Sequence, residues 1–388
     1  MAKKKADVNK LTIKTSVLQE MVAKAVKGAK NDKVLPLTQM MAIQLKDNVL
    51  TLITTSVTNT LYIRANKVDG NDFYVVVPVE KFSKLIARLT SDTVSMEIDD
   101  KSKSLAVKGN GNYNVEIQYD EDDTMVVFPD PLEEVELDED ALSINNTTVN
   151  VILNTLRPAL AQTLENPCYT GYYVGEKVVA TDRFLINALN VELFEEPRLI
   201  RPEVMDLLDC MTAEKIQVDF SDDIVIFSSP DCVVFSRDLE GIEDFSIDAI
   251  SNYIDLPFES VCKIPKAQLL QLLDRLSLFV TEYDKGGIYL TFTKDGLQVT
   301  SKASSAVELI PYVESSDFKS YTCCMDINML MKQVKAYTGD SIEIWYGSDS
   351  AIKFVRDNIV QIIALLDDDR FEEEDDVDTD YDEEADDE

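Results

Sequence analysis

A carboxylate interrupts an apolar run at Asp182, in the segment VATDRFLINAL of residues 179–189. A carboxylate exposed at the end of a strand can act as a general acid or base, or as a metal ligand. It can equally form a turn or a local hydrogen bond that shapes a binding surface. The other reactive residues of the chain decide how far each interpretation can be taken.

The sequence contains no histidine. This excludes Ser-His-Asp and Cys-His catalysis and removes the commonest proton shuttle at neutral pH. The cysteines show no C-x-x-C spacing, so we expect reduced thiols rather than a zinc site or disulfides, and we expect no cofactor. They are Cys168, Cys210, Cys232, Cys262, Cys323 and Cys324. No residue is predicted to be catalytic.

The formal net charge of the chain is −35, which on its own argues against a nucleic-acid partner. Its distribution is uneven, because residues 367–388 hold sixteen acids and one arginine, a composition typical of a disordered tail. A second acidic cluster at residues 119–140 predicts a strand end and an interdomain linker. The start is basic but lacks the apolar core of a signal peptide, and no apolar run could span a bilayer, so we expect a cytoplasmic protein without membrane contact.

The sequence repeats at a long interval. Three segments combine an apolar helix, a turn and a short strand, and their threonines Thr90, Thr212 and Thr338 recur at intervals of 122 and 126 residues. These segments are 79–98, 201–220 and 326–346. Helical patterns followed by strand hairpins precede them at 16–29, 147–157 and 265–279. A period near 120 residues predicts tandem domains of one fold.

We therefore predict an α+β protein of three tandem domains, each with two helices packed on antiparallel sheets. The predicted domains are residues 1–130, 131–256 and 257–366, followed by a disordered acidic tail at 367–388. Pro158 is expected to end the first helix of the second domain.

Three stretches resemble the bacterial-type DNA polymerase III beta sliding clamp. Residues 35–55, LPLTQMMAIQLKDNVLTLITT, resemble the family's Leu-Pro segment and the strands after it. VVATDRFLI lies where the family has Ala-Thr-Asp-Gly-His-Arg-Leu, and GIEDFSI resembles Gly-x-Phe-Pro-Asp-Tyr without its proline. The resemblance covers residues 10–366 through the order and spacing of these stretches.

The resemblance implies a DNA-clamp fold and a processivity factor without enzymatic activity. Such a clamp is a head-to-tail homodimer whose six domains form a ring around double-stranded DNA, held by sequence-independent attraction to phosphates. It binds DNA polymerase and the clamp loader through short peptides. Two alternatives stay open, a metal-dependent nucleic-acid hydrolase that uses Asp182 and a repeat-domain scaffold that does not bind DNA. The departures from the family pattern would suit a phage-encoded clamp.

Basic residues concentrate on the predicted helices of this acidic chain. Lys81, Lys84 and Arg88 stand at i, i+3 and i+7, on one face of a helix. The solvated side of an amphipathic helix is the alternative explanation, but with the resemblance we favour contact with DNA. The predicted DNA-binding residues are Lys24, Lys27, Lys30, Lys33, Lys81, Lys84, Arg88, Arg157, Arg275, Lys332 and Lys335.

The resemblance also implies an apolar groove between domains two and three that captures partner peptides. For its apolar members, simple alternation into a sheet core is the alternative. The predicted peptide-binding residues are Tyr169, Thr181, Arg183, Phe184, Leu185, Ile186, Ile363, Ala364 and Leu365. The repeat places Asp182 opposite Thr54 and Ser301, which predicts a local hydrogen-bonding role for the acid.

Overall fold

A computed structural model describes residues 10–99, 102–128, 142–281, 286–303, 305–316 and 319–367. Contacts divide the chain into two compact units. Unit 1 comprises Met1–Arg183 and Asn187–Ser246, and unit 2 comprises Phe184–Ile186 and Ile247–Glu388. The predicted boundary at residue 130 and the predicted acidic tail beyond Asp367 lie outside the described residues. The division into three domains with these boundaries stays a prediction.

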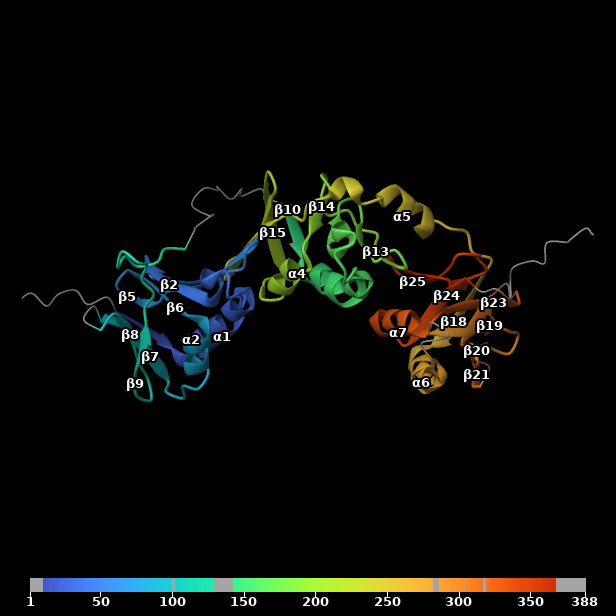
Figure 1. Cartoon of the computed structure of the whole chain (residues 1–388), viewed down its shortest axis with the longest axis horizontal. Helices are drawn as coiled ribbons and strands as arrows, with labels where there is room; N and C mark the ends of the chain where they lie inside the picture. Colours follow the sequence, from blue (N-terminus) through green and yellow to red (C-terminus); the bar gives the residue numbers. More distant parts are fainter. Residues whose placement is uncertain are drawn as a thin grey trace, which may run out of the picture. The chain divides into compact units, whose positions relative to one another are not determined.

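The first repeat lies in unit 1 and is built from two successive strand–helix–strand segments. The first segment contains β1 (Lys10–Lys14), α1 (Thr15–Ala25), η1 (Val26–Gly28), η2 (Pro36–Gln39), β2 (Met40–Lys46), β3 (Val49–Thr55) and β4 (Asn59–Asn66). The second contains β5 (Asp69–Gly70), β6 (Phe73–Pro78), α2 (Val79–Ile86), β7 (Thr93–Asp99), β8 (Ser104–Lys108) and β9 (Asn112–Glu116). Helices α1 and α2 lie side by side (Figure 1). α1 buries Leu18, Met21 and Val22, which share one face at helical spacing.

The second repeat follows the same order. Its first segment contains β10 (Leu142–Asn145), α3 (Asn146–Val151), η4 (Ile152–Leu156), η5 (Arg157–Ala159), η6 (Pro167–Thr170), β11 (Tyr172–Val174), β12 (Val178–Thr181) and β13 (Leu185–Leu189). Its second contains β14 (Arg198–Ile200), α4 (Pro202–Leu208), β15 (Lys215–Ser221), β16 (Ile224–Ser229), β17 (Cys232–Arg237) and η7 (Ile242–Asp244). The helical path that starts with α3 ends in η5, which contains Pro158, as the proline predicts.

The third repeat lies in unit 2, after α5 (Ile247–Ile254). Its elements are β18 (Ser260–Pro265), α6 (Lys266–Leu276), η8 (Ser277–Phe279), β19 (Gly287–Phe292), β20 (Leu297–Ser301), β21 (Val307–Ile310), β22 (Glu314–Ser316), β23 (Tyr321–Asp326), α7 (Ile327–Ala336), β24 (Ser341–Tyr346), β25 (Ala351–Arg356) and β26 (Ile359–Ala364). Helices α6 and α7 pack together. The predicted α+β architecture of repeated helix and antiparallel-sheet domains is confirmed.

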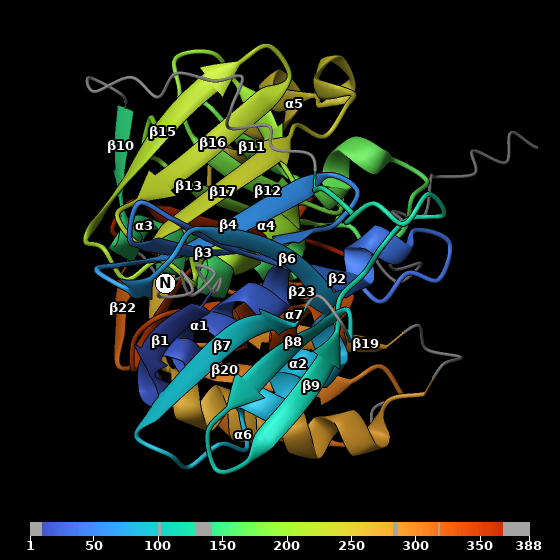
Figure 2. The ribbon, with the colours of Figure 1, turned by 90° about the vertical axis from the view of Figure 1, so that its left-hand side faces the viewer.

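One sheet of unit 1 runs through both of its repeats. Its strand order is β10-β15-β16-β17-β4-β3-β2-β6, and Figure 2 shows these strands side by side. The two repeats meet where β17 pairs with β4, with Val233 opposite Tyr62 and Phe235 opposite Thr60. One face of the sheet buries Tyr62 and Val233 in a common core with residues of β2, β3, β6 and β16. Alternation of side chains along each strand therefore fixes the register of this junction.

The other sheets leave edge strands. In unit 1 the order β5-β1-β7-β8-β9 ends at β9, and the order β14-β11-β12 begins at β14. In unit 2 the orders are β26-β25-β24-β18-β22 and β21-β20-β19-β23, so β21 is an edge. An edge strand presents unpaired backbone groups to which another chain can add.

All six cysteines are free and buried, which agrees with the prediction of reduced thiols. Burial raises the pKa of the Cys210 and Cys232 thiols. Among the described helices, none has the length and apolar character needed to cross a membrane.

Gly28 lies where the end of the first helix meets β3 and β4. A Cβ atom at this position would stand 2.5 Å from Thr54 Oγ1 and 2.7 Å from Leu61 Cβ, and both residues are fully buried. The Thr54 hydroxyl also donates a 2.7 Å hydrogen bond to the Ala25 carbonyl. The absence of a side chain at Gly28 therefore permits this close contact between helix and sheet.

We expect Gly28→Ala to lower the free energy of unfolding by about 1–3 kcal/mol, because the added methyl overpacks a closed contact. Gly111→Ala is the matched control, since its Cβ would meet only the end of the Tyr113 side chain at 3.2 Å. Urea denaturation of both variants measures the difference. Equal stability of the two variants would show that the contact at Gly28 relaxes freely.

Candidate nucleic-acid interface

Lys24 and Lys27, at the end of the first helix, bind carboxylates of the second repeat. Lys24 Nζ lies 3.3 Å from Asp231 Oδ2 and 3.1 Å from Glu20 Oε1. Lys27 Nζ lies 3.1 Å from Asp209 Oδ2. Both lysines were predicted to contact DNA, and the structure gives them a second role at the junction of the two repeats.

Three further predicted cations are also paired. Lys84 on α2 binds Glu80 one turn earlier. Arg157 makes two hydrogen bonds with Asp206, of 2.5 and 2.9 Å, and Arg275 on α6 makes two with Glu308, of 2.9 and 2.5 Å. Such forked pairing satisfies the guanidinium geometry and competes with a phosphate for the same donors.

The remaining predicted cations form no ion pair within the part of the chain that the structure describes. All are exposed; they are Lys30, Lys33, Lys81, Arg88, Lys332 and Lys335. Lys332 and Lys335 lie on α7, and Lys81 lies on α2. Arg88 lies beyond α2, whose C-cap is Ala87, so the predicted helical face holds for Lys81 and Lys84 but not for Arg88. These six side chains are the ones most available to phosphate.

The ion pairs of Arg157, Lys27 and Lys24 raise the pKa of these three cations. The hydrogen bond to Asp206 is the largest cause of the raised pKa of Arg157. Burial alone would lower the pKa of Lys27, but the hydrogen bond to Asp209 and the nearby negative charges outweigh it and raise the pKa. The same balance raises the pKa of Lys24, through Glu20 and Asp231. All three groups therefore stay protonated at neutral pH.

The segment around Asp182 forms a tight turn in unit 1. The Thr181 hydroxyl accepts a 3.0 Å hydrogen bond from the Arg183 N–H, and Thr181 is buried. Thr54 and Ser301 are equally buried, and Asp182 directly follows Thr181 in the turn, so the local hydrogen-bonding role of Asp182 stays a prediction. Arg183 has a φ of 81°, in the left-handed region that favours glycine. Arg183 stands where the resemblance places the glycine of the family.

The remaining predicted peptide-binding residues differ in exposure. In unit 1, the rings of Tyr169 and Phe245 pack in a T-shaped arrangement, with centroids 5.3 Å apart. In unit 2, the Ala364 N–H donates a 2.9 Å hydrogen bond to the Phe184 carbonyl, which brings these two segments together. Phe184 is 57% exposed. The others in unit 2 are Leu185, Ile186 and Ile363, which are buried, and Leu365, which is half-buried.

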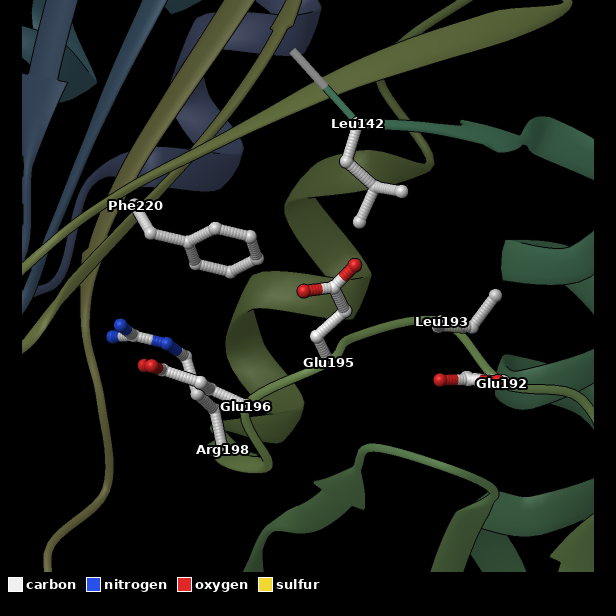
Figure 3. Close-up of a pocket in the computed structure, with 7 residues that line it drawn as sticks. All are labelled: Leu142, Glu192, Leu193, Glu195, Glu196, Arg198 and Phe220. Atoms are coloured by element: carbon white, nitrogen blue, oxygen red, sulfur yellow. The ribbon is translucent and has the colours of Figure 1, made fainter.

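A hollow of about 580 Å³ lies in the second repeat (Figure 3). Leu142, Phe220 and Glu195 point into it, and Glu192 and Glu196 lie at its border. Arg198 lies over the Phe220 ring, with Cζ 4.8 Å from the ring centroid, and bonds to Asp238 at 2.7 Å. The described residues form no cluster of three or more His, Cys, Asp or Glu side chains that could hold a metal ion. The hydrolase alternative is not supported.

The sequence prediction missed the acids that neutralise the cations. They are Asp206, Asp209, Asp231 and Glu308. The spacing of four residues between Glu80 and Lys84, or between Glu20 and Lys24, is a readable signal on a helix. No such signal existed for Asp231, which is 207 residues away from Lys24 in sequence.

Comparison with known proteins gives a family for the first repeat and a fold for the chain. Residues 9–125 match the family described as DNA polymerase III beta subunit, N-terminal domain. A comparison with curated proteins finds no match in sequence.

Solved structures of bacterial clamps match over nearly the whole length. The beta subunit of Streptococcus pyogenes has a TM-score of 0.81 at 14% identity, covering 92% of this chain and 100% of that one. The sliding clamp of Bacillus subtilis has a TM-score of 0.79 at 17% identity, covering 94% and 100%. The beta subunit of Thermotoga maritima has a TM-score of 0.76 at 15% identity, covering 92% and 99%. The chain therefore has the fold of the bacterial DNA polymerase III beta sliding clamps, and its first repeat matches the N-terminal domain of that family.

Proposed function

We propose that this protein is a DNA sliding clamp that encircles duplex DNA and tethers the replicative polymerase for processive synthesis. The observation that carries the proposal is the match of nearly the whole chain to solved clamps, joined with a family match at residues 9–125. A clamp has no chemical step to catalyse, and the chain, which lacks histidine, acts as a binding protein. The scaffold alternative keeps the fold but predicts no affinity for DNA.

A ring requires that two copies close on each other, and the edge strands offer surfaces for this. Around β21 in unit 2, large apolar side chains are exposed, with Leu278 at 81% and Leu309 at 53%. Val307 and Phe279 are exposed beside them in sequence. On β9 in unit 1, Tyr113 is 37% exposed at the edge of its sheet. We propose a head-to-tail homodimer in which β9 of one copy pairs with β21 of the other, twice.

We expect Leu278→Asp to raise the dimer dissociation constant at least ~30-fold, because a charge in the centre of an apolar interface costs ~2 kcal/mol or more. Leu164→Asp is the matched control, since Leu164 is 79% exposed and lies in the second repeat. Analytical ultracentrifugation at several concentrations measures both. A native protein that sediments only as a monomer at micromolar concentration would remove the proposed ring.

Contact with DNA is proposed for the exposed cations that have no carboxylate partner in the described residues. Lys81 and Arg88 in the first repeat, and Lys332 and Lys335 in the third, offer charge to phosphates without first breaking an ion pair. Attraction of this kind is independent of base sequence and weakens with salt, as sliding requires.

We expect the double charge reversal Lys81→Glu and Arg88→Glu to weaken binding to a short duplex about tenfold at ~50 mM salt, and to lower the salt slope by about 2. The matched control is Lys46→Glu with Lys67→Glu, which makes the same charge change at exposed strand-end positions of unit 1. Fluorescence anisotropy of labelled DNA measures both variants. An equal loss in both would indicate a general effect of net charge and return Lys81 and Arg88 to an ordinary solvated face.

Capture of partner peptides is proposed at Phe184 and the end of β26. An exposed aromatic side chain beside half-buried Ala364 and Leu365 provides an apolar anchor for a short linear motif. The family's Gly-His-Arg is replaced by Arg183, Phe184 and Leu185, so we expect a more hydrophobic peptide than the family pattern implies.

We test Phe184→Ala in primer extension by the cognate polymerase, with the variant placed on DNA by the clamp loader and ATP. We expect the products to become shorter and to approach the length obtained without the clamp. Phe220→Ala is the matched control, because Phe220 is 40% exposed in the hollow of the second repeat. DNA retention should be unchanged in both variants. Products of native length with Phe184→Ala would exclude this residue as a peptide anchor.

A further inference from the structure

Helix α4 differs from α1, α2, α6 and α7 in the charge that it exposes. A basic residue stands in the last turn of α1, α2, α6 and α7, whereas α4 has none. Its buried side is formed by Val204, Leu207 and Leu208 with Met205. The acids Glu203, Asp206 and Asp209 follow at intervals of three residues, which places them along the opposite side.

Two of these acids bind cations that come from different repeats. Asp206 receives both hydrogen bonds of the Arg157 guanidinium, at 2.5 and 2.9 Å. Asp209 binds Lys27 Nζ at 3.1 Å, and the charge of Asp206 also acts on Lys27. The acidic side of α4 thus lies between a cation of the first repeat and a cation of the second.

A hollow of about 360 Å³ opens at the same place. Lys27, Lys30, Glu203 and Asp206 are among its lining residues, so bases and acids face one space. The paired side chains are accessible, with exposures of 47% and 57% for Lys27 and Asp209 and of 49% and 45% for Arg157 and Asp206. Ion pairs exposed to this degree are weak, so a phosphate that arrives can compete for the cations.

We propose that Asp206 and Asp209 compete with DNA phosphate for Arg157 and Lys27, and so weaken the hold of this part of the protein on duplex DNA. The inference rests on the proposed clamp function and specifies its regulation at one surface of unit 1. A phosphate that binds Lys27 or Arg157 must displace a carboxylate and then lie beside it. Displacing the carboxylate costs part of the free energy that the new phosphate contact provides. The net attraction to DNA therefore stays weak enough for the protein to move along the duplex.

The test uses the full-length protein with Asp206→Asn and Asp209→Asn combined. Binding to a fluorescein-labelled linear duplex of about 30 base pairs is measured by anisotropy between ~50 and ~200 mM salt, since open duplex ends admit a ring without a loader. We expect affinity at ~50 mM salt to rise about tenfold and the salt slope to steepen by 1 to 2, as two cations become available to phosphate. If a thermal melt shows that the double variant is unfolded, Asp209→Asn alone replaces it. We expect this single variant to give part of the gain in affinity.

A control of equal charge separates local competition from net charge. Glu121→Gln with Asp122→Asn removes two exposed negative charges that belong to no ion pair among the described residues. We expect this control to change affinity much less than the α4 variant does, because its charges pair with none of the predicted cations and act on phosphate only through the screened long-range field. A gain equal to that of the α4 variant would overturn the proposal.

A second comparison tests whether the freed cations carry the gain. Lys27→Ala with Arg157→Ala should change DNA binding little in the native background and should remove the gain in the Asp206→Asn, Asp209→Asn background. A gain that survives these substitutions, or an α4 variant that binds like the native protein, would overturn the proposal. If Lys81→Glu with Arg88→Glu still weakens binding in that case, the clamp function stands without it. If no form of the protein binds duplex DNA at ~50 mM salt, the proposed function itself fails.

Discussion

The pairing of β17 with β4 is the interaction on which the rest of unit 1 depends. It joins two repeats through backbone hydrogen bonds and places Val233 opposite Tyr62 in a shared core. The same junction brings the end of the first helix to the second repeat, where the Cys210 thiol lies 3.9 Å from the Lys24 carbonyl. The ion pairs of Lys24 and Lys27 follow from this placement. Both faces of these strands are buried, so a slip of one residue would exchange the side chains that fill the two cores; the register that prevents this also fixes these charges.

If the protein acts as the proposed clamp, its charge distribution must satisfy two opposing demands. A net charge of −35 repels DNA at long range, yet exposed cations such as Lys81 and Lys332 remain on helices. Screening at physiological salt reduces the long-range repulsion and leaves short-range contacts with phosphate. Where acids stand beside bases, as at Arg157 and Asp206, the local field is nearly cancelled. Under the proposed clamp function, attraction to DNA would then depend on a few positions rather than on the total charge.

Periodicity in the sequence was sufficient to predict the elements and their repetition. Apolar residues at helical spacing, such as Leu18 and Met21, and the proline at position 158 marked helices and an end that the structure confirms. These signals are local, because they depend on residues within a few turns of each other. The resemblance to clamps added the arrangement of the repeats, which no single motif carries.

Contacts between residues far apart in the chain could not be predicted from the sequence. Asp209 and Lys27 are 182 residues apart, and only the fold brings them together. Arg88 was expected on a helix that ends before it, since helix ends are set by capping and packing as well as by spacing. The hydrogen bond from the Arg183 N–H to the buried Thr181 hydroxyl at the end of β12 was also not predicted, because it depends on the left-handed turn at Arg183.

The burial of every cysteine has a practical consequence for following motion in this protein. A thiol that is sealed in the core, with its pKa raised, reacts with an alkylating reagent only when its surroundings open. The alkylation rates of Cys210 and Cys232 thus report local opening near the junction of the first two repeats. Those of Cys323 and Cys324 report local opening around β23. No cysteine precedes position 168, so the first repeat has no thiol that could report its opening. The native chain already carries a set of site-resolved reporters without any introduced label.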